Sequence, residues 1–131
     1  MKIYVAGKFT ERDAIVKVLD KIKELGHEVA YDWTTHKPIK PYFEHQETAN
    51  QYSQNELAGI SKTDVFIYFS HEKGHTLHME FGAALILKYT TGKPLIYVIG
   101  DHQDISPWLF NSLVVHKDTV EEALDEIISK S

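Results

Sequence analysis

The stretch GHTLHMEFGAAL, residues 74–85, gathers two histidines, a threonine and a glutamate and then continues with small and apolar side chains. Its Glu80 could lie at a helix N-terminus, ligate a metal ion or attack a carbon atom as a nucleophile. The apolar neighbours are unusual for a solvated turn, and Gly82 lets a ligand or a second backbone come close. Composition alone leaves both a functional carboxylate and a surface carboxylate favoured by the helix dipole open.

A metal site here would use His75, His78 and Glu80, the usual pair of histidines with a carboxylate. His75 is expected to precede the helix that starts near residue 76, and Glu80 points to a different side of that helix from His78. The spacing also differs from HExxH. We therefore expect no metal ion and no other cofactor. The absence of cysteine excludes thiolate chemistry and cysteine-based zinc sites.

A second carboxylate with possible chemistry is Glu56. Ala49, Ser53, Glu56 and Ile60 follow one helical stripe, which places Glu56 at the border of the inward face. Burial and the negative end of the helix dipole would both raise its pKa, as a general acid requires. The alternative is a glutamate at the edge of this face that reaches solvent.

Several loop residues are suited to contact a ligand. The segment HKPIKPY, residues 36–42, could form a positively charged lid, although an ordinary solvated loop has the same composition. Four aromatic residues could stack on a nucleobase, and packing in the core or in loops explains each of them equally well: Trp33, Tyr42, Phe43 and Trp108.

Strand and helix patterns alternate along the chain. Apolar runs predict five strands, at residues 2–6, 27–33, 64–69, 93–100 and 113–116. Helical spacing predicts four helices, at residues 11–25, 47–60, 76–89 and 120–128, the first capped by Thr10 with Asp13 and the last by Thr119. The continuous apolar strands favour a parallel sheet with helices on both faces. We expect one α/β domain over residues 1–131, a flavodoxin-like or Rossmann-like three-layer sandwich with strand order 2-1-3-4-5.

Ligands of such folds bind beyond the carboxyl ends of the strands. The loops that follow the first four predicted strands begin GKFTER, TTHKPIKPY, SHEKGHTLHME and DHQDISPW, and they contain most of the residues with possible chemistry. Asp64 opens the third strand at the opposite edge, so we expect it to serve the helix-to-strand junction.

Composition limits the classes of partner. A chain of 131 residues that is 43% apolar can build one core, and its net charge of −5 argues against binding polymeric nucleic acid. A local positive pocket for a small anion remains compatible with that charge. No apolar run approaches the roughly 20 residues of a membrane helix. MKIYVAG at the start resembles a strand and not a signal peptide, so we expect a cytoplasmic protein without membrane contact.

Three stretches, taken in order, resemble the nucleoside 2-deoxyribosyltransferase superfamily, which includes the 2'-deoxynucleoside 5'-phosphate N-hydrolases. They are KIYVAGKFTER, NELAGISKTDVFIYF and GHTLHMEFGAALILKYTTGKP. The first is similar to the family's strand and Gly-aromatic loop, and the second to its acid-Leu-x-x-Ile-x-x-x-Asp pattern before an apolar strand. The third is similar to its Glu-aromatic/apolar-Gly-x-Ala helix followed by Lys-Pro. With the strand order, the resemblance covers most of residues 2–100.

The resemblance implies cleavage or transfer at the N-glycosidic bond of 2'-deoxynucleosides or their 5'-monophosphates, through a covalent intermediate on Glu80. Glu56 stands where the family usually has an aspartate that handles the proton of the leaving base, and Tyr4 matches a tyrosine that positions the nucleophile. A carboxylate beneath the sugar stabilises the oxocarbenium-like transition state and then traps it. A retaining pair holds its carboxyls about 5 to 5.5 Å apart.

The resemblance also suggests substrate contacts. Gly7 and Phe9 match the loop beside sugar and base, and His78 replaces a residue that is often small. Lys8, Thr10 and Arg12, with the N-terminus of the third helix, could hold a 5'-phosphate. The remaining expected contacts are Trp33, Gly74, His75, Thr76, Ser106 and Asn111.

In the family a residue after the fourth strand of a neighbouring subunit can complete the site, and Ser106 and Asn111 are candidates for it. The precedent therefore implies a homodimer or a higher homo-oligomer. Two other functions stay open: a non-catalytic nucleotide-binding or sensing module on this fold, and a related glycohydrolase that acts on ribosides such as NAD.

Overall fold

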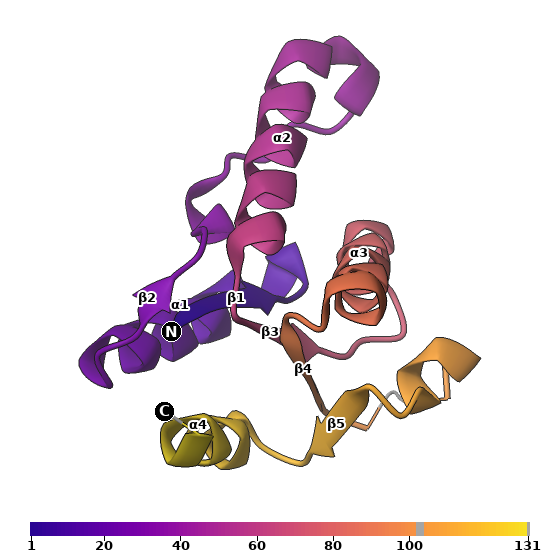
Figure 1. Ribbon diagram of the computed structural model, residues 1–131. Coiled ribbons are helices and arrows are strands. Elements are labelled where there is room, and N and C mark those ends of the chain that lie inside the picture. Colours follow the sequence, from indigo (N-terminus) through magenta and orange to yellow (C-terminus); the bar gives the residue numbers. More distant parts are fainter. Residues whose placement is uncertain (102–103, 131) are drawn as a thin grey trace.

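The computed structural model describes residues 1–101 and 104–130, and Figure 1 shows their arrangement. Five parallel strands form one sheet in the order β2-β1-β3-β4-β5, which confirms the predicted order. The strands are β1 (Lys2–Ala6), β2 (Glu28–Val29), β3 (Val65–Phe69), β4 (Leu95–Ile99) and β5 (Val114–Lys117). His102 and Gln103 of the loop after β4 lie outside the described residues.

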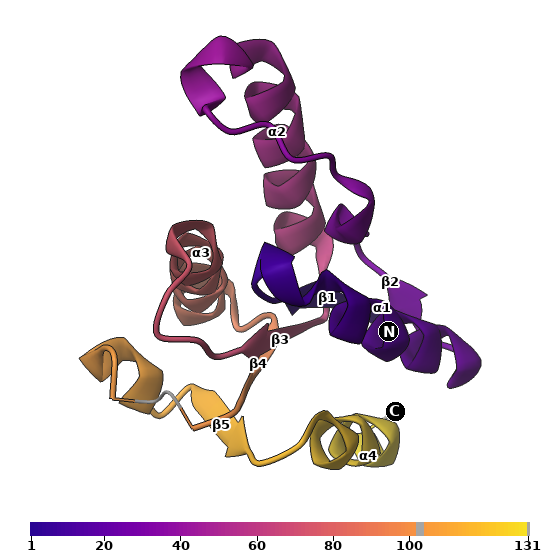
Figure 2. The same ribbon diagram turned by 180° about the vertical axis from the view of Figure 1, so that it is seen from behind.

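The helices form the two outer layers of a sandwich, with α1 and α4 on one face of the sheet and α2 and α3 on the other (Figures 1 and 2). They are α1 (Arg12–Glu24), α2 (Gln46–Lys62), α3 (His75–Thr91) and α4 (Val120–Lys130). Among the described residues, four 3-10 helices lie in the connections, namely η1 (Phe9–Glu11), η2 (Trp33–Thr35), η3 (Tyr42–Glu44) and η4 (Pro107–Phe110). The α/β three-layer class expected from the continuous apolar strands is confirmed.

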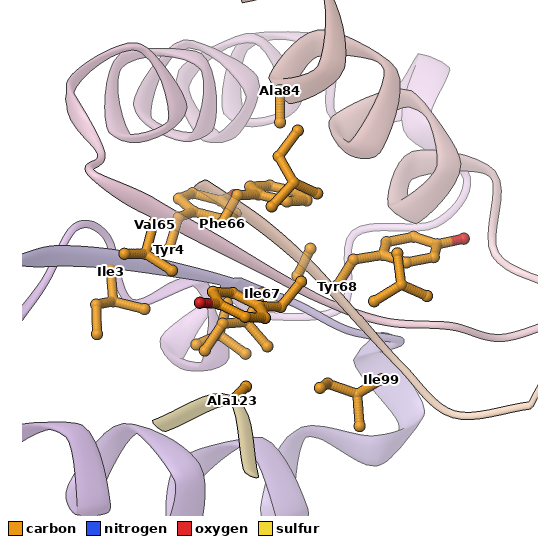
Figure 3. Packing of buried hydrophobic residues seen from close by; sticks show 14 of the residues in the cluster. Ile3, Tyr4, Val65, Phe66, Ile67, Tyr68, Ala84, Ile99 and Ala123 are labelled. Atoms are coloured by element: carbon orange, nitrogen blue, oxygen red, sulfur yellow. The ribbon is translucent and has the colours of Figure 1, made fainter. Parts of the chain in front are cut away.

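The central strands are buried on both faces, because side chains alternate along each strand and each face meets a helix layer. Tyr4 and Phe66 are register partners on β1 and β3, and their rings stack with centroids 5.6 Å apart. Figure 3 shows them on the side of Ala84 from α3, whereas Ile99 lies toward Ala123 of α4. The register thus turns Tyr4 toward the layer that carries both candidate carboxylates.

The second strand is much shorter than the predicted 27–33. The amide of Ala30 still donates to the Ile3 carbonyl at 2.8 Å, but the chain then turns away from β1. Asp32 accepts the backbone N–H of Thr34 at 2.9 Å, a local bond that stabilises the 3-10 turn of η2 instead of an extended ladder. The apolar pattern predicted a parallel strand here, but not that the strand ends after 2 residues.

Two helix starts also differ from the predictions. Thr10 does not cap α1, because the turn of η1, closed by the bond from Glu11 N to Lys8 O at 2.8 Å, comes first and α1 begins at Arg12. His75 is the first residue of α3, since Gly74 with its φ of +119° starts the helix one residue earlier than expected. The predicted cap of α4 is confirmed, as the hydroxyl of Thr119 accepts the Glu122 N–H at 3.3 Å.

Asp64 joins the starts of three strands, as its place at the junction predicted. Its carboxylate accepts the Lys2 amide at 2.8 Å and the Lys93 ammonium at 3.1 Å. The bond from the Lys2 amide, followed by that from Lys93, lowers the pKa of Asp64 below its ordinary value. Across the described residues, no helix is both long enough and apolar enough to cross a bilayer.

Candidate functional site

The centre of the candidate site is a contact between β1 and α3. The Tyr4 hydroxyl donates a hydrogen bond to the Glu80 carboxylate, and 9% of Glu80 is exposed. Glu80 is on the face of α3 that packs on the sheet, together with Leu77, Phe81 and Ala84. A carboxylate among apolar residues in this position is not the solvated helix-start residue that composition left open.

Burial dominates the electrostatics of Glu80. It raises the pKa of the carboxyl to about 8, while the hydrogen bond from Tyr4 acts in the opposite direction and the negative charge of Glu56 adds to the rise. Burial and the charge of Glu80 raise the pKa of Tyr4 above its ordinary value, so the phenol remains a hydrogen-bond donor. The carboxyl can therefore change its protonation state in the neutral to alkaline range.

Glu56 lies on α2, half-buried, at the border of the inward face where the helical stripe predicted it. Burial raises its pKa. Its charge raises the pKa of both Tyr4 and Glu80, which places the three groups in one electrostatic cluster. Residues from β1, α2 and α3, which are far apart in the chain, are thus brought together in one place.

The sequence analysis missed Tyr31, which belongs to the same cluster. It lies beside Tyr4, since both side chains flank the Cβ position of Gly59, and its hydroxyl bonds to His36 Nε2 at 2.6 Å and accepts from Asn55 Nδ2 at 3.4 Å. Asn55 directly precedes Glu56 on α2. The available signal was the place of Tyr31 near the carboxyl end of the second strand, at the ligand edge.

The close approach of α2 to β1 depends on Gly59. A Cβ at this position would lie 2.8 Å from Tyr31 Cβ and 3.2 Å from Tyr4 Cε2, closer than packed atoms allow. The glycine therefore lets α2, which carries Glu56 one turn earlier, pack closely against Tyr4. It was not selected from the sequence, because only the tertiary contact gives it a role.

The expected lid, residues 36–42, is attached to α2 at its start. The His36 ring stacks on Tyr52 with centroids 3.7 Å apart, and the Lys37 amide donates to the Tyr52 hydroxyl at 3.1 Å. Tyr42 and Phe43 of η3 are exposed, and the Lys40 ammonium lies 5.8 Å from the centre of the Tyr42 ring.

The loop after β1 combines packing with polar groups. A Cβ on Gly7 would lie 2.7 Å from Ile15 Cδ1, so a larger residue here would displace the end of the Ile15 side chain. Phe9 lies between Trp33, with centroids 6.4 Å apart, and the Arg12 guanidinium, 4.9 Å from its ring. Trp33 is buried, and its indole N–H donates to Val5 O at 2.6 Å. Packing in the core therefore explains this tryptophan.

The first turn of α3 lies beside this loop. Lys8 Cγ is 3.9 Å from the position of a Cβ on Gly74, and His71 Nε2 is 3.5 Å from Glu11 Oε1 across the same two loops. His75 and Thr76 are exposed at the helix start, which has no side-chain cap. Thr10 is also exposed. These contacts join the β1 and β3 loops at the carboxyl edge of the sheet.

His78 bonds to a different tyrosine from Glu80. Its Nδ1 lies 2.7 Å from the hydroxyl of Tyr68, at the end of β3, while its Nε2 is buried without a hydrogen-bond partner. Glu80 and His78 are two residues apart on α3, so they point to opposite flanks of the helix. Tyr68 was missed by the sequence analysis, although its register with Ala6 places it on the Tyr4 face of the sheet.

The two residues expected after β4 make local turn contacts. The Ser106 hydroxyl accepts the Trp108 amide at 3.2 Å, and Asn111 Oδ1 accepts the Leu113 amide at 2.9 Å. Trp108 of η4 reaches α3, where its Cζ3 lies 3.7 Å from the position of a Cβ on Gly82. Neither polar residue contacts Tyr4, Glu56 or Glu80 through a hydrogen bond in the described structure.

Metal ligation is not the common feature of these side chains. Over residues 1–101 and 104–130, no three or more histidine, aspartate or glutamate residues are grouped so that they could hold a metal ion. The cluster instead offers one carboxyl that accepts a tyrosine hydroxyl and a second carboxyl with a raised pKa. Such a pair can supply a nucleophile and a proton donor.

One solved structure with a similar chain is that of Clostridium botulinum CMP N-glycosidase, BcmB. The match covers 100% of both chains with a TM-score of 0.62 and 17% sequence identity. At this identity the likeness shows the fold, and it agrees with the three-layer architecture that the sequence resemblance implied. No family model matches the chain, and no curated protein matches it significantly.

Proposed function

We propose that this chain belongs to the nucleoside 2-deoxyribosyltransferase superfamily and cleaves the N-glycosidic bond of a 2'-deoxynucleoside or its 5'-monophosphate. The observation that carries the proposal is the buried hydrogen bond from Tyr4 to Glu80, with the charge of Glu56 acting on both. A full-length fold likeness to a protein named as a CMP N-glycosidase supports it.

In the proposed reaction, a Glu80 carboxylate oxygen forms a bond to C1' of the sugar while the bond from C1' to the base nitrogen breaks. The electron pair of that bond stays on the base, and Glu56 supplies the proton that neutralises it. Water then attacks C1', the ester to Glu80 breaks, and Glu56 takes the proton from the water. A second base in place of water gives transfer, with the same retained configuration.

The protonation states set a condition on this reaction. Glu80 must be ionised to attack. Its pKa of about 8, however, keeps most Glu80 side chains protonated at pH 7 in the protein without substrate. The hydrogen bond from Tyr4 increases the ionised fraction. Positive charge that develops on the sugar would stabilise the carboxylate further, so the pair favours the transition state over the free site.

The loops near α3 are suited to a 5'-phosphate. Lys8 lies next to Gly74 at the start of α3, and the first N–H groups of this helix have no side-chain cap. Free N–H groups and the positive end of a helix dipole favour an anion. We assign the phosphate to this place, with Thr10 of η1 and Arg12 at the start of α1 as further donors.

A second candidate is cleavage of a ribonucleotide. The fold likeness to a protein named as a CMP N-glycosidase favours it, because CMP carries a 2'-hydroxyl. The chemistry assigned to Glu80 and Glu56 is the same for both sugars. The two candidates differ in whether the site accepts the 2'-hydroxyl of a ribose, on the carbon next to C1'.

The test is chromatography of the products from a panel of deoxyribo- and ribonucleosides and their 5'-monophosphates, with and without a second base. Free base should appear with the wild-type chain and be lost in Glu80→Gln, whereas Glu121→Gln on α4 should match the wild type. Nucleotide binding without base release over hours would instead support a non-catalytic module. Equal turnover of ribosides and deoxyribosides would favour the riboside glycohydrolase.

The covalent step has its own readout. A slow 2-fluoro-deoxynucleoside should leave a sugar adduct that mass spectrometry of the digested protein locates on Glu80. An adduct on another residue would refute the role of Glu80 even if base is released.

A further inference from the structure

Tyr31, just beyond the end of β2, meets α2 at two places. Its Cβ lies 2.8 Å from the position of a Cβ on Gly59, and its hydroxyl accepts a hydrogen bond from Asn55 Nδ2 at 3.4 Å. Asn55 and Gly59 are four residues apart in the helix, so they lie one turn apart on the same side. Tyr31 therefore fixes this turn of α2 against the chain that leaves β2.

His36 extends the contact by a further turn of α2. Its Nε2 lies 2.6 Å from the Tyr31 hydroxyl, and its ring stacks on Tyr52 with centroids 3.7 Å apart and an interplanar angle of 4°. Tyr52, Asn55 and Gly59 follow one another at spacings of three and four residues, so they share one side of the helix. The Tyr31–His36 pair thus holds two successive turns of α2.

The hydrogen bonds around the Tyr31–His36 pair run in one direction. Gln51 Nε2 donates to Asn55 Oδ1 at 2.9 Å, and Asn55 Nδ2 donates to the Tyr31 hydroxyl. The phenol proton is then directed to His36 Nε2, which can accept it because burial lowers the pKa of His36 and keeps the ring neutral at pH 7. Hydrogen bonds aligned in this way polarise and strengthen one another.

Glu56 lies within the stretch of α2 that the pair holds. It directly follows Asn55, one turn after Tyr52 and three residues before Gly59. The N-terminal end of the helix has a different setting: it extends beyond the sheet in both ribbon views, and residues 46–48 are exposed (Figures 1 and 2). The place of the Glu56 carboxyl therefore depends on where these two turns are fixed.

We propose that Tyr31 and His36 are positioning residues, which hold Glu56 in the place from which its carboxyl gives a proton to the leaving base. The proposal rests on the proposed role of Glu56 as the proton donor. Tyr31 and His36 act through α2 and touch no reacting atom. Their effect is expected because a proton donor must lie within hydrogen-bond distance of its acceptor, and a displacement of about 1 Å can remove much of its contribution.

The first experiment compares two substrates with the same sugar. One is the natural nucleoside or nucleotide that is turned over fastest, and the other is a nitrophenyl glycoside, whose phenolate leaves without a proton. Tyr31→Phe should lower kcat for the natural substrate roughly tenfold or more, with KM unchanged. It should change kcat for the nitrophenyl glycoside by less than about twofold, because that reaction needs no acid.

The control variant is Tyr89→Phe, which changes a tyrosine of α3 that is 75% exposed and should match the wild type on both substrates. An equal loss on both substrates in Tyr31→Phe would indicate a general structural role and would overturn the proposal. Unaltered turnover of the natural substrate would overturn it as well.

Two further variants test the route of the effect. In a Glu56→Gln background, Tyr31→Phe should cause no additional loss, because both changes act on the same proton transfer. His36→Gln retains an oxygen that can accept the phenol proton, so it should keep more of the rate than His36→Leu. Independent, multiplying losses from Tyr31→Phe and Glu56→Gln would refute a route through Glu56.

The second experiment needs no activity. Carbon-13 NMR of the side-chain carboxyls gives the pKa of Glu56, whose signal is identified by its absence in Glu56→Gln. Burial raises this pKa in the wild type, so a loosened turn in Tyr31→Phe should admit water and lower it toward the ordinary value of 4.5. Tyr89→Phe should leave it in place.

The NMR result separates this proposal from the proposed reaction. An unchanged pKa of Glu56 in Tyr31→Phe would overturn the positioning role, whether or not the wild type releases base. A lowered pKa in a protein that releases no base would reject the proposed reaction and would still show that Tyr31 holds Glu56 in place.

Discussion

The hydroxyl of Tyr4 on β1 donates a hydrogen bond to the carboxylate of Glu80 on α3, which joins two residues 76 positions apart in the chain. The bond exists because β1 and β3 pair in parallel and α3 packs across both. It holds an ionisable carboxyl at a buried position whose pKa is about 8.

Replacement of Tyr4 by phenylalanine should shift the pH dependence of base release. With a substrate whose leaving group needs no proton, so that Glu56 is not required as an acid, kcat/KM should increase as the pH rises through about 8, because Glu80 must lose its proton to act as nucleophile. Tyr4→Phe removes the hydrogen bond that lowers this pKa, so the midpoint should move to higher pH and the rate at pH 7 should fall. Tyr68→Phe, which loses a hydroxyl bonded to His78, should leave the midpoint in place.

Replacement of Glu56 should have the opposite effect on the midpoint. Glu56→Gln removes a negative charge that raises the pKa of Glu80, so the rise in kcat/KM should occur at lower pH. With a natural nucleoside, whose base must gain a proton to leave, the variant also loses the proton donor, which typically costs 10²- to 10⁴-fold in rate. Glu47→Gln, at the exposed start of the same helix, should change neither quantity. An unaltered rate in Glu56→Gln would remove Glu56 from the mechanism.

Glu80 should reduce the stability of the fold at alkaline pH. The folded state keeps a proton on Glu80 up to a pKa of about 8, whereas the unfolded chain loses it near the ordinary value of 4.5. Between these values each pH unit lowers the free energy of unfolding by about 1.4 kcal/mol. Glu80→Gln does not titrate, so urea unfolding should show its advantage over the wild type growing from pH 5 to pH 8. A constant difference across this range would contradict the raised pKa.

Gly59→Ala should destabilise the protein. The added methyl group meets Tyr31 and Tyr4 at 2.8 and 3.2 Å, and overpacking of this kind typically costs 1–3 kcal/mol. Alanine gains about 1 kcal/mol over glycine within a helix, so the net loss in urea unfolding should be up to about 2 kcal/mol. Gly82→Ala is the matched control, because the added methyl group would make only an ordinary contact with Trp108 at 3.7 Å. The higher helix propensity of alanine should therefore make this variant at least as stable as the wild type.

Local patterns were sufficient for most of the secondary structure. Continuous apolar runs predicted five parallel strands, and the helical spacing located four helices, because a buried strand and an amphipathic helix impose distinct periodicities on the side chains. They were insufficient at Asp32 and at residues 9–11, where single side-chain or backbone hydrogen bonds form 3-10 turns. Such turns leave no period in the sequence.

The sequence alone determined the fold class, the edge of the sheet at which the unusual residues gather, and the pattern that selected Tyr4, Glu56 and Glu80. It could not show that Tyr31 and Gly59 belong to the same cluster, nor that His78 bonds to Tyr68 on the opposite flank of α3. Those relations depend on which residues of different elements come within a few ångströms of one another. Periodicity acts along one element, whereas burial, hydrogen bonds and pKa values arise between elements, so the tertiary structure alone decided them.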